Sequence, residues 1–210
     1  MSPMSPEVRQ LEPRRVIRMD HFEAQFEYFT QRGVFFLDSE IEEGMPTLIL
    51  MALLRYHRDA DPIRPVWVVL NSPGGSVHQG FAIYDTLRMI EKMGRTVNIL
   101  SIGAVASMAT FILQAGTHRY SLPHSQFLIH EVSDFSFGSE GVSEGEERLE
   151  EKKRLNSILM STIARRSGAN LTELSKKAKK KDYWLDAQAA RELGPHGLID
   201  KIVDTIPFEF

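Results

Sequence analysis

A continuous apolar run, Val66–Leu70, followed by the glycine-rich turn Ser72–Ser76, restricts the fold of this chain more than any other feature. Five apolar residues in a row, three of them valines, are typical of a strand buried on both faces of a parallel sheet. After the turn, one face of an amphipathic helix carries Ile83, Tyr84, Leu87 and Ile90. A buried strand joined by a tight turn to a covering helix predicts an α/β fold.

The same alternation occurs on both sides of this unit. Strands are predicted at 34–37, 96–102 and 126–129, and helices at 46–58 and 107–115, with a turn of small residues between 102 and 107. Strands and helices that alternate at this spacing predict right-handed crossovers and a mostly parallel sheet.

The last third of the chain is predicted to be mainly helical. A long helix ends near Gly168, and a short helix begins at about Asn170. A further helix is capped by Asp186, and a final strand covers 198–203. The long helix exceeds what a compact βαβ layer needs, so we expect part of it to project and pack against another subunit.

Composition narrows the function classes. The chain has 210 residues, which suits one domain with an appended arm, and we expect a mobile amino-terminal arm. Its formal net charge of -3 gives no general attraction for nucleic acid. The sequence has no cysteine, so a nucleophile must be an oxygen or an amine.

The first twenty residues lack the apolar run of a secretory signal, and the longest apolar stretch, 48–54, is too short to span a membrane. These features predict a cytoplasmic protein without membrane or nucleic-acid partners.

Candidate catalytic groups stand at the ends of three predicted strands. Ser107 follows one strand, His130 closes another, and Gly74 and Gly75 follow a third. The carboxyl ends of parallel strands share one edge of a sheet, so these residues are expected to converge. A hydroxyl, an imidazole and backbone N–H donors are the parts that acyl transfer needs. Each residue alone also has a structural interpretation, as a helix cap, a packed histidine or a turn.

Three other active-site motifs are excluded by spacing. His130-Glu131 begins like a zinc-protease motif, but Asp134 stands where the second histidine would be. The Gly74-Gly75 turn lacks the lysine of a phosphate-binding loop, and Ser107 lacks the flanking glycines of an esterase elbow. No metal and no cofactor are predicted.

Taken together, these segments resemble the proteolytic subunit of the Clp protease. The likeness rests on Leu70–Val77 and Gly103–Ala109, on Leu122–Ser125 with Ile129-His130, and on Asp182–Leu185. It extends from about residue 32 to 203. Ala109 departs from the family, which usually has glycine there.

The resemblance implies a crotonase-like fold. Its head would be a βαβ superhelix, and a helical handle would protrude at about residues 131–168. The peptidase domain would cover 32–210, with an arm and first helix at 1–31 that match the family poorly. Heptameric rings, stacked as a tetradecamer, would enclose a chamber in which polypeptides are cleaved.

The resemblance also implies a role for each site residue. Ser107 would be the nucleophile, His130 the general base and then acid, and Asp182 the group that orients the imidazole. The backbone N–H groups of Gly75 and Met108 would form the oxyanion hole. The implied activity is that of a serine endopeptidase.

A docking surface for an AAA+ unfoldase is a further implication of the resemblance. Core packing alone would give the same apolar residue types, so both interpretations stay open. The corresponding positions are Trp67, Val69, Leu100, Ile102, Tyr120 and Val203.

Two other functions remain as alternatives. An acyl-CoA hydratase or hydrolase with a crotonase-like fold would use the same oxyanion hole without a Ser-His-Asp set. A structural ring subunit that co-assembles with an active paralogue would need no catalytic residues, although three candidate residues are present here.

Overall fold

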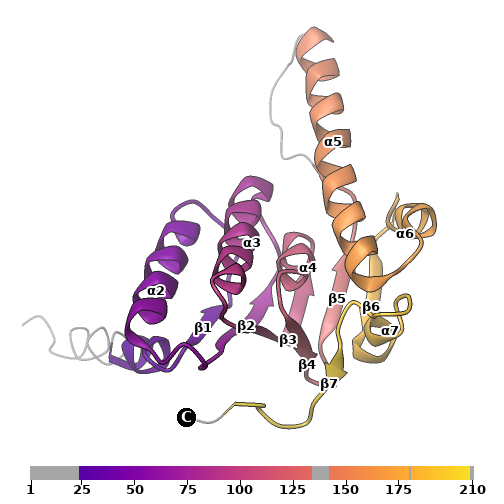
Figure 1. The fold of residues 1–210 in the computed structure, drawn as a ribbon. Helices are drawn as coiled ribbons and strands as arrows, with labels where there is room; N and C mark the ends of the chain where they lie inside the picture. Colours follow the sequence, from indigo (N-terminus) through magenta and orange to yellow (C-terminus); the bar gives the residue numbers. More distant parts are fainter. Residues whose placement is uncertain (1–23, 134–141, 180, 209–210) are drawn as a thin grey trace, which may run out of the picture.

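The computed structural model describes residues 24–133, 142–179 and 181–208. It confirms a mixed α/β architecture built on one seven-stranded sheet. Residues 24–30 are helical, and the rest of the predicted arm at 1–31 lies largely outside the described residues. Figure 1 shows the sheet with helices packed along one side.

The sheet is parallel except for one strand pair. Its main path runs β1-β2-β3-β4-β7, and β5 pairs with both β3 and β6. Only β5 and β6 run antiparallel. The strands are β1 (Val34–Leu37), β2 (Val66–Ser72), β3 (Val97–Ala106), β4 (His118–Ser121), β5 (Gln126–Ile129), β6 (Tyr183–Asp186) and β7 (Lys201–Ile202).

Three helices cover one face of this sheet (Figure 1). They are α2 (Met45–Asp59), α3 (Val77–Lys92) and α4 (Met108–Leu113). In the apolar stripe predicted on α3, Ile83, Leu87 and Ile90 are fully buried and share a core cluster with the inward side chains of β2 and β3. Tyr84 is only half buried and packs against that cluster. Removal of this apolar surface from water is the main stabilising term of such a layer.

The last helices pack beside the sheet. They are α5 (Val142–Ser167), α6 (Leu171–Ala178) and α7 (Ala187–Arg191). Asp186 caps α7, as predicted, and Asn170, near which a helix was predicted to begin, caps α6; each side chain accepts a hydrogen bond from a backbone N–H. The carboxyl-terminal half of α5 joins the core through Leu159 and Ile163, whereas Leu149 is half exposed. Figure 1 shows that the amino-terminal half of α5 extends beyond the other helices.

The strand predicted at 96–102 is longer than expected. It continues through Gly103 to Ala106, where a turn of small residues was predicted. At the bend β3 exchanges one neighbour for another: 98–101 pair with β4, and 104–106 pair with β5. Gly103 has φ 57°, and the Asn71 side chain accepts a hydrogen bond from the Ala104 N–H at 3.0 Å. The Asn71 amide therefore stabilises the bend that allows β3 to pair with both β4 and β5.

Other boundaries also differ from the predictions. The helix predicted at 107–115 is shorter and begins only at Met108. The final strand predicted at 198–203 shrinks to β7, because Leu198 and Ile199 are buried in a turn and not paired. The strand β4 was not predicted, since its sequence mixes charged and polar residues. Within the described ranges, no helix has the length and apolarity needed to cross a membrane.

A buried guanidinium ties α2 to the sheet. Arg95 is 1% exposed and donates to the backbone carbonyls of Asp61 and Arg64 at 2.8 and 2.6 Å. It also donates to the carbonyls of His57 and Ala60 at 3.2 Å. These carbonyls belong to the end of α2 and the loop after it, so Arg95 satisfies acceptors that the helix leaves free.

We therefore predict that Arg95→Leu destabilises the chain by about 3 kcal/mol, because buried carbonyls lose their charged donor. Urea denaturation monitored by circular dichroism measures the change in the free energy of unfolding. The matched control is Arg58→Leu, since the Arg58 side chain is 74% exposed. Equal losses in the two variants would contradict a stabilising role for Arg95.

Candidate active site

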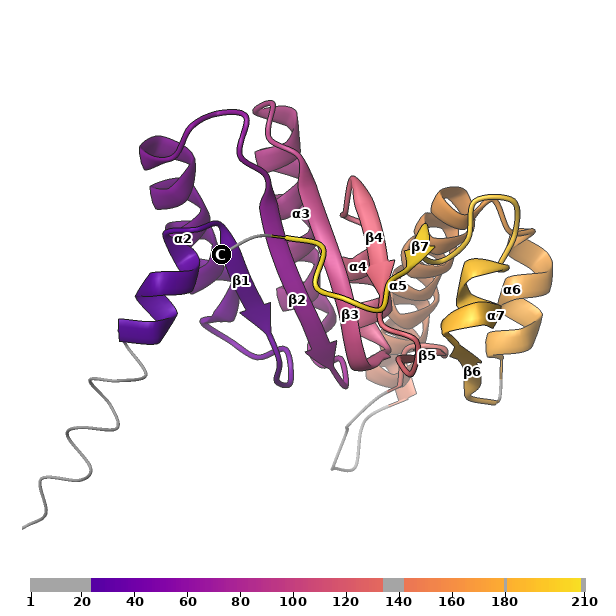
Figure 2. The same ribbon diagram turned by 90° about the horizontal axis from the view of Figure 1, so that it is seen from below.

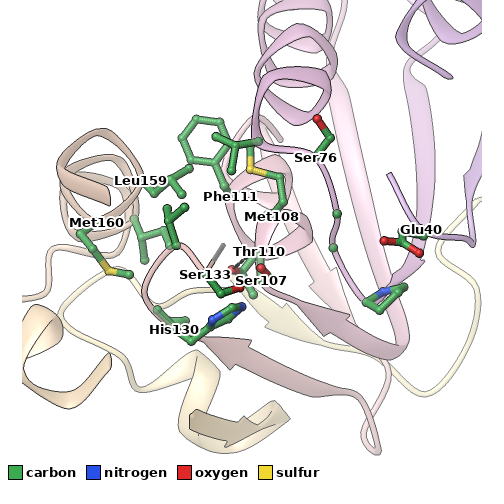
Figure 3. Close-up of a pocket in the computed structure, with 17 residues that line it drawn as sticks. Glu40, Ser76, Ser107, Met108, Thr110, Phe111, His130, Ser133, Leu159 and Met160 are labelled. Atoms are coloured by element: carbon green, nitrogen blue, oxygen red, sulfur yellow. Dashed lines mark hydrogen bonds between the residues drawn. The ribbon is translucent and has the colours of Figure 1, made fainter. Parts of the chain in front are cut away.

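A cavity of about 460 Å³ opens at the edge of the sheet where β2, β3 and β5 end (Figure 3). Gly74, Gly75, Ser107 and His130 all line it. The residues at these three strand ends therefore meet at one edge of the sheet, as predicted.

Ser107 occupies a strained turn between β3 and α4. Its φ of 54° makes it the one non-glycine residue with positive φ in the part of the chain that the structure describes. Its N–H donates to the Leu128 carbonyl at 2.9 Å, and its carbonyl accepts from the Thr110 hydroxyl at 2.6 Å. Its side chain makes no cap hydrogen bond to α4. Such strain in a non-glycine residue is typical of functional sites, and here it leaves the hydroxyl at the cavity.

The glycine turn approaches the Ser107 turn closely. A Cβ atom built on Gly74 would lie 2.7 Å from the Ser107 Cβ and 2.9 Å from the Met108 nitrogen. Gly74 also has φ 98°, which disfavours any side chain. The two turns can be in contact only because position 74 is glycine.

Two backbone N–H groups next to this contact have no hydrogen-bond partner in the described part of the chain. Among the described residues, no hydrogen bond is donated by the N–H of Gly75 or of Met108. Met108 is held in place because its side chain is buried against Gly80, where a built Cβ would lie 2.3 Å from the Met108 Cγ. Free, fixed donors beside a serine hydroxyl are suited to binding an oxyanion.

His130 follows the last residue of β5. Figure 3 shows its ring directed toward Ser107 across the cavity. No hydrogen bond joins the Ser107 hydroxyl to the His130 ring in this single chain. The structure therefore brings the two side chains to one cavity without aligning them.

Asp182 and His130 are one position beyond the last pair of the β5–β6 ladder. The register pairs Ile129 with Tyr183, so the next antiparallel position places His130 opposite Asp182. Residues directly opposite each other on such a ladder have Cβ atoms about 5 Å apart. Asp182 is exposed, does not line the cavity and makes no hydrogen bond to His130 among the described residues.

The cavity has an apolar end and an acidic rim that the sequence did not reveal. The apolar end is formed by Phe111 on α4 and by Leu159, Met160 and Ile163 on α5. Glu40 lines the opposite side (Figure 3), and a Cβ built on Gly75 would lie 3.1 Å from its Cγ. Its position follows from the bridge between Ile41 and Gly75, a nonlocal pairing without a sequence signal.

The residues predicted as a docking surface fall mostly on the face of the sheet opposite α2, α3 and α4. Trp67 and Val69 are buried with Val34 in one cluster, and Ile102 and Tyr120 pack against it. Leu100 is buried outside this cluster. Val203 is half buried, and its N–H donates to the Ser121 carbonyl.

Comparison with known proteins gives a consistent match. The Clp protease family model matches residues 18–206. The chain is 36% identical to an ATP-dependent Clp protease proteolytic subunit of Porphyromonas gingivalis, over 97% of this chain and 85% of that protein. It is 33% identical to an ATP-dependent Clp protease proteolytic subunit 3 of Synechococcus sp. (strain CC9605), over 83% of this chain and 86% of that protein.

The contact between the two turns predicts a specific sensitivity. Gly74→Ala should lower the free energy of unfolding by more than Gly44→Ala, because its added methyl group meets the Ser107 turn. Gly44 has φ 83° and no atom within 4 Å of a built Cβ, so it reports left-handed strain alone, about 1–2 kcal/mol. Thermal and urea denaturation of both variants measure the difference. Equal destabilisation would show that the turns can separate freely.

Proposed function

The chain belongs to the Clp protease family, and we propose that it is a serine endopeptidase that cleaves unfolded polypeptides and peptides. The observation that carries the proposal is the strained Ser107 turn, which shares a cavity with His130 and lies beside two unpartnered N–H groups. The family match supports a Clp-type peptidase.

Ser107 is the proposed nucleophile. Its Oγ attacks the scissile carbonyl carbon while His130 accepts the hydroxyl proton, and His130 then donates that proton to the departing amine. A water molecule hydrolyses the resulting ester by the same proton transfers in reverse. Acylation and deacylation thus use one imidazole in both directions.

The N–H groups of Gly75 and Met108 are the proposed oxyanion hole. Each would donate to the negatively charged oxygen of the tetrahedral intermediate, and one such donor stabilises the transition state by roughly 3 kcal/mol. The close approach of the two turns supports this role, because it brings donors from separate strands to one side of Ser107.

Asp182 is proposed to orient His130 and to stabilise the imidazolium. In the single chain the Asp182 carboxylate and the His130 ring are not hydrogen-bonded. We propose that assembly or substrate binding aligns them, since neighbouring positions on the β5–β6 ladder need only side-chain rotation and a small backbone shift.

The projecting part of α5 supports an oligomeric assembly. We propose that residues 131–168 form a handle that contacts other subunits, and that heptameric rings stack as a tetradecamer around a chamber. The half-exposed Leu149 would be covered there. A crotonase-like arrangement of the head and an AAA+ unfoldase that supplies unfolded chains belong to the same proposal.

Replacement of the nucleophile gives the first test. Ser107→Ala should abolish labelling by a fluorophosphonate probe and lower cleavage of a fluorogenic peptide by at least about 10³-fold, because the proposed ester forms on the Ser107 hydroxyl. Ser133→Ala is the matched control, since Ser133 lines the same cavity. Labelling that persists in Ser107→Ala would refute the assignment, and an acyl-CoA enzyme would then be favoured.

Asp182 should affect the rate of peptide cleavage through its effect on the His130 imidazole. Asp182→Asn is expected to lower kcat for peptide cleavage at least ~100-fold, because an amide does not stabilise the imidazolium. Asp186→Asn is the control at the other end of β6, where asparagine also caps a helix well. Equal kcat values in Asp182→Asn and the unchanged chain would exclude Asp182 as the orienting acid.

The proposed ring assembly is tested by measuring the mass of the particle in solution. Static light scattering at micromolar concentration should give fourteen times the mass of one chain. Leu149→Glu should reduce this mass, since a charge would be placed in the proposed subunit contact. A monomeric mass for the unchanged chain would contradict the ring proposal.

A further inference from the structure

Of the described residues that line the cavity beside Ser107, Glu40 alone carries a carboxylate. No lysine or arginine is among these lining residues, and the other ionisable side chain among them is that of His130. The Glu40 side chain is exposed, and its carboxylate makes no hydrogen bond or ion pair in the described part of the chain. The proposed mechanism gives this charge no role, so it is available to a bound substrate.

The position of Glu40 is fixed by the next residue, which is hydrogen-bonded to the glycine turn. The Ile41 N–H donates to the Gly74 carbonyl at 2.8 Å, and the Ile41 carbonyl accepts from the Ser76 N–H at 2.9 Å. Ile41 is itself buried, with 2% of its surface exposed. Figure 2 shows the loop that follows β1 beside the end of β2, where this bridge forms.

The residue before Glu40 is held in the same way. Ser72 is 1% exposed, and its hydroxyl donates to the Ser39 carbonyl at 2.6 Å while it accepts from the Gly74 N–H at 3.1 Å. The backbone on both sides of Glu40 is thus hydrogen-bonded to the end of β2 and its turn. The carboxylate therefore extends from a fixed point at the edge of the cavity.

Glu40 also lies next to one donor of the proposed oxyanion hole. A Cβ atom built on Gly75 would lie 3.1 Å from the Glu40 Cγ, and the carboxyl carbon is bonded directly to that Cγ. A negative charge at this place repels the charge that develops on the oxyanion. For a substrate without a positive charge, Glu40 therefore opposes the step that the Gly75 N–H promotes.

The carboxylate and the apolar end of the cavity lie on opposite sides of Ser107. Figure 3 shows Leu159 and Met160 on one side and Glu40 on the other. An extended peptide with its scissile carbonyl at Ser107 would meet an apolar surface in one direction and a negative charge in the other. The side chains that complement this charge are lysine and arginine, whose long stems let the cation reach a fixed carboxylate.

We propose that Glu40 is a specificity-determining residue that favours substrates with a lysine or arginine within two residues of the scissile bond. The inference rests on the proposed peptidase function, since it names a substrate class for the same site. The basic side chain pairs with the Glu40 carboxylate and offsets the repulsion between that carboxylate and the oxyanion. Selectivity thus has an attractive part and a repulsive part.

Glu40→Gln separates these effects, because glutamine keeps the size of the side chain and removes its charge. The value of kcat/KM for a basic peptide should fall at least about threefold, as expected for the loss of one exposed ion pair. For a neutral peptide kcat should instead rise, because the repulsion of the oxyanion is gone. A purely structural role for Glu40 would lower both values together, and that result would overturn the proposal.

The substrates are acetylated and amidated peptides that differ at one position. Lysine or glutamine is placed in turn at each of the two positions on either side of the cleaved bond, and mass spectrometry identifies that bond. With both ends blocked, the lysine side chain supplies the only difference in charge. In the unchanged chain kcat/KM should favour lysine at least about threefold at one or more positions, and added salt should reduce this preference.

Glu43→Gln is the matched control, since Glu43 is exposed in the same loop and does not line the cavity. This variant should keep the preference for lysine, whereas Glu40→Gln should lose it. Equal kcat/KM values for lysine and glutamine at all four positions of the unchanged chain would overturn the proposal. An equal loss of the preference in both variants would also overturn it.

Binding provides a readout that needs no cleavage. The same peptides, labelled with an uncharged fluorophore, are titrated with Ser107→Ala and with the double variant Ser107→Ala/Glu40→Gln. Fluorescence anisotropy should give at least one lysine peptide a Kd about threefold below that of its glutamine counterpart in Ser107→Ala, and equal Kd values in the double variant. No difference in Ser107→Ala, or no binding of any peptide, would contradict recognition by Glu40.

The two readouts distinguish this inference from the proposed function. If the unchanged chain cleaved no peptide while Ser107→Ala still bound lysine peptides more tightly, the peptidase proposal would fail and recognition by Glu40 would stand. If the chain cleaved and bound lysine and glutamine peptides equally, only the role of Glu40 would fail.

Discussion

The site depends on the contact between two tight turns at the edge of a parallel sheet. Gly74 leaves the space into which the Ser107 turn fits, and the strain at Ser107 is tolerated because Thr110 and Leu128 fix its backbone on both sides. Hydroxyl and N–H donors thereby reach one cavity from separate strands. The surrounding βαβ layers, with their buried apolar faces, keep the two strands in register and so hold the contact together.

The sequence was sufficient to predict the framework of the fold, because strand and helix periodicities are local. The structure contains the buried run at 66–70, the helix on which Ile83 lies, the helix that begins next to Asn170, and the cap at Asp186. The meeting of Gly74, Ser107 and His130 could also be predicted, since parallel strands end at a common edge. Each of these predictions uses only residues that are close in sequence, together with the rule that the carboxyl ends of parallel strands share one edge.

Nonlocal pairings could not be predicted. The bend at Gly103 appears in the sequence as a small-residue turn, and only the exchange of β4 for β5 shows why the strand continues. Glu40 enters the cavity through one bridge to Gly75, and Asp182 approaches His130 through an antiparallel pair in an otherwise parallel sheet. The family resemblance supplied the role of Asp182, because neither its sequence context nor its exposure singles it out.

The continuity of β3 has a mechanical consequence. Ile102 packs against the cluster of Val34, Trp67 and Val69, and Ser107 directly follows the last residue of the same strand, so continuous strand backbone joins this face of the sheet to the Ser107 turn. Between Ile102 and Ser107, the Asn71 side chain holds the bend at Gly103 by accepting a hydrogen bond from the Ala104 N–H. Because this backbone is strand throughout, a displacement at Ile102 would reach the Ser107 turn without an intervening loop.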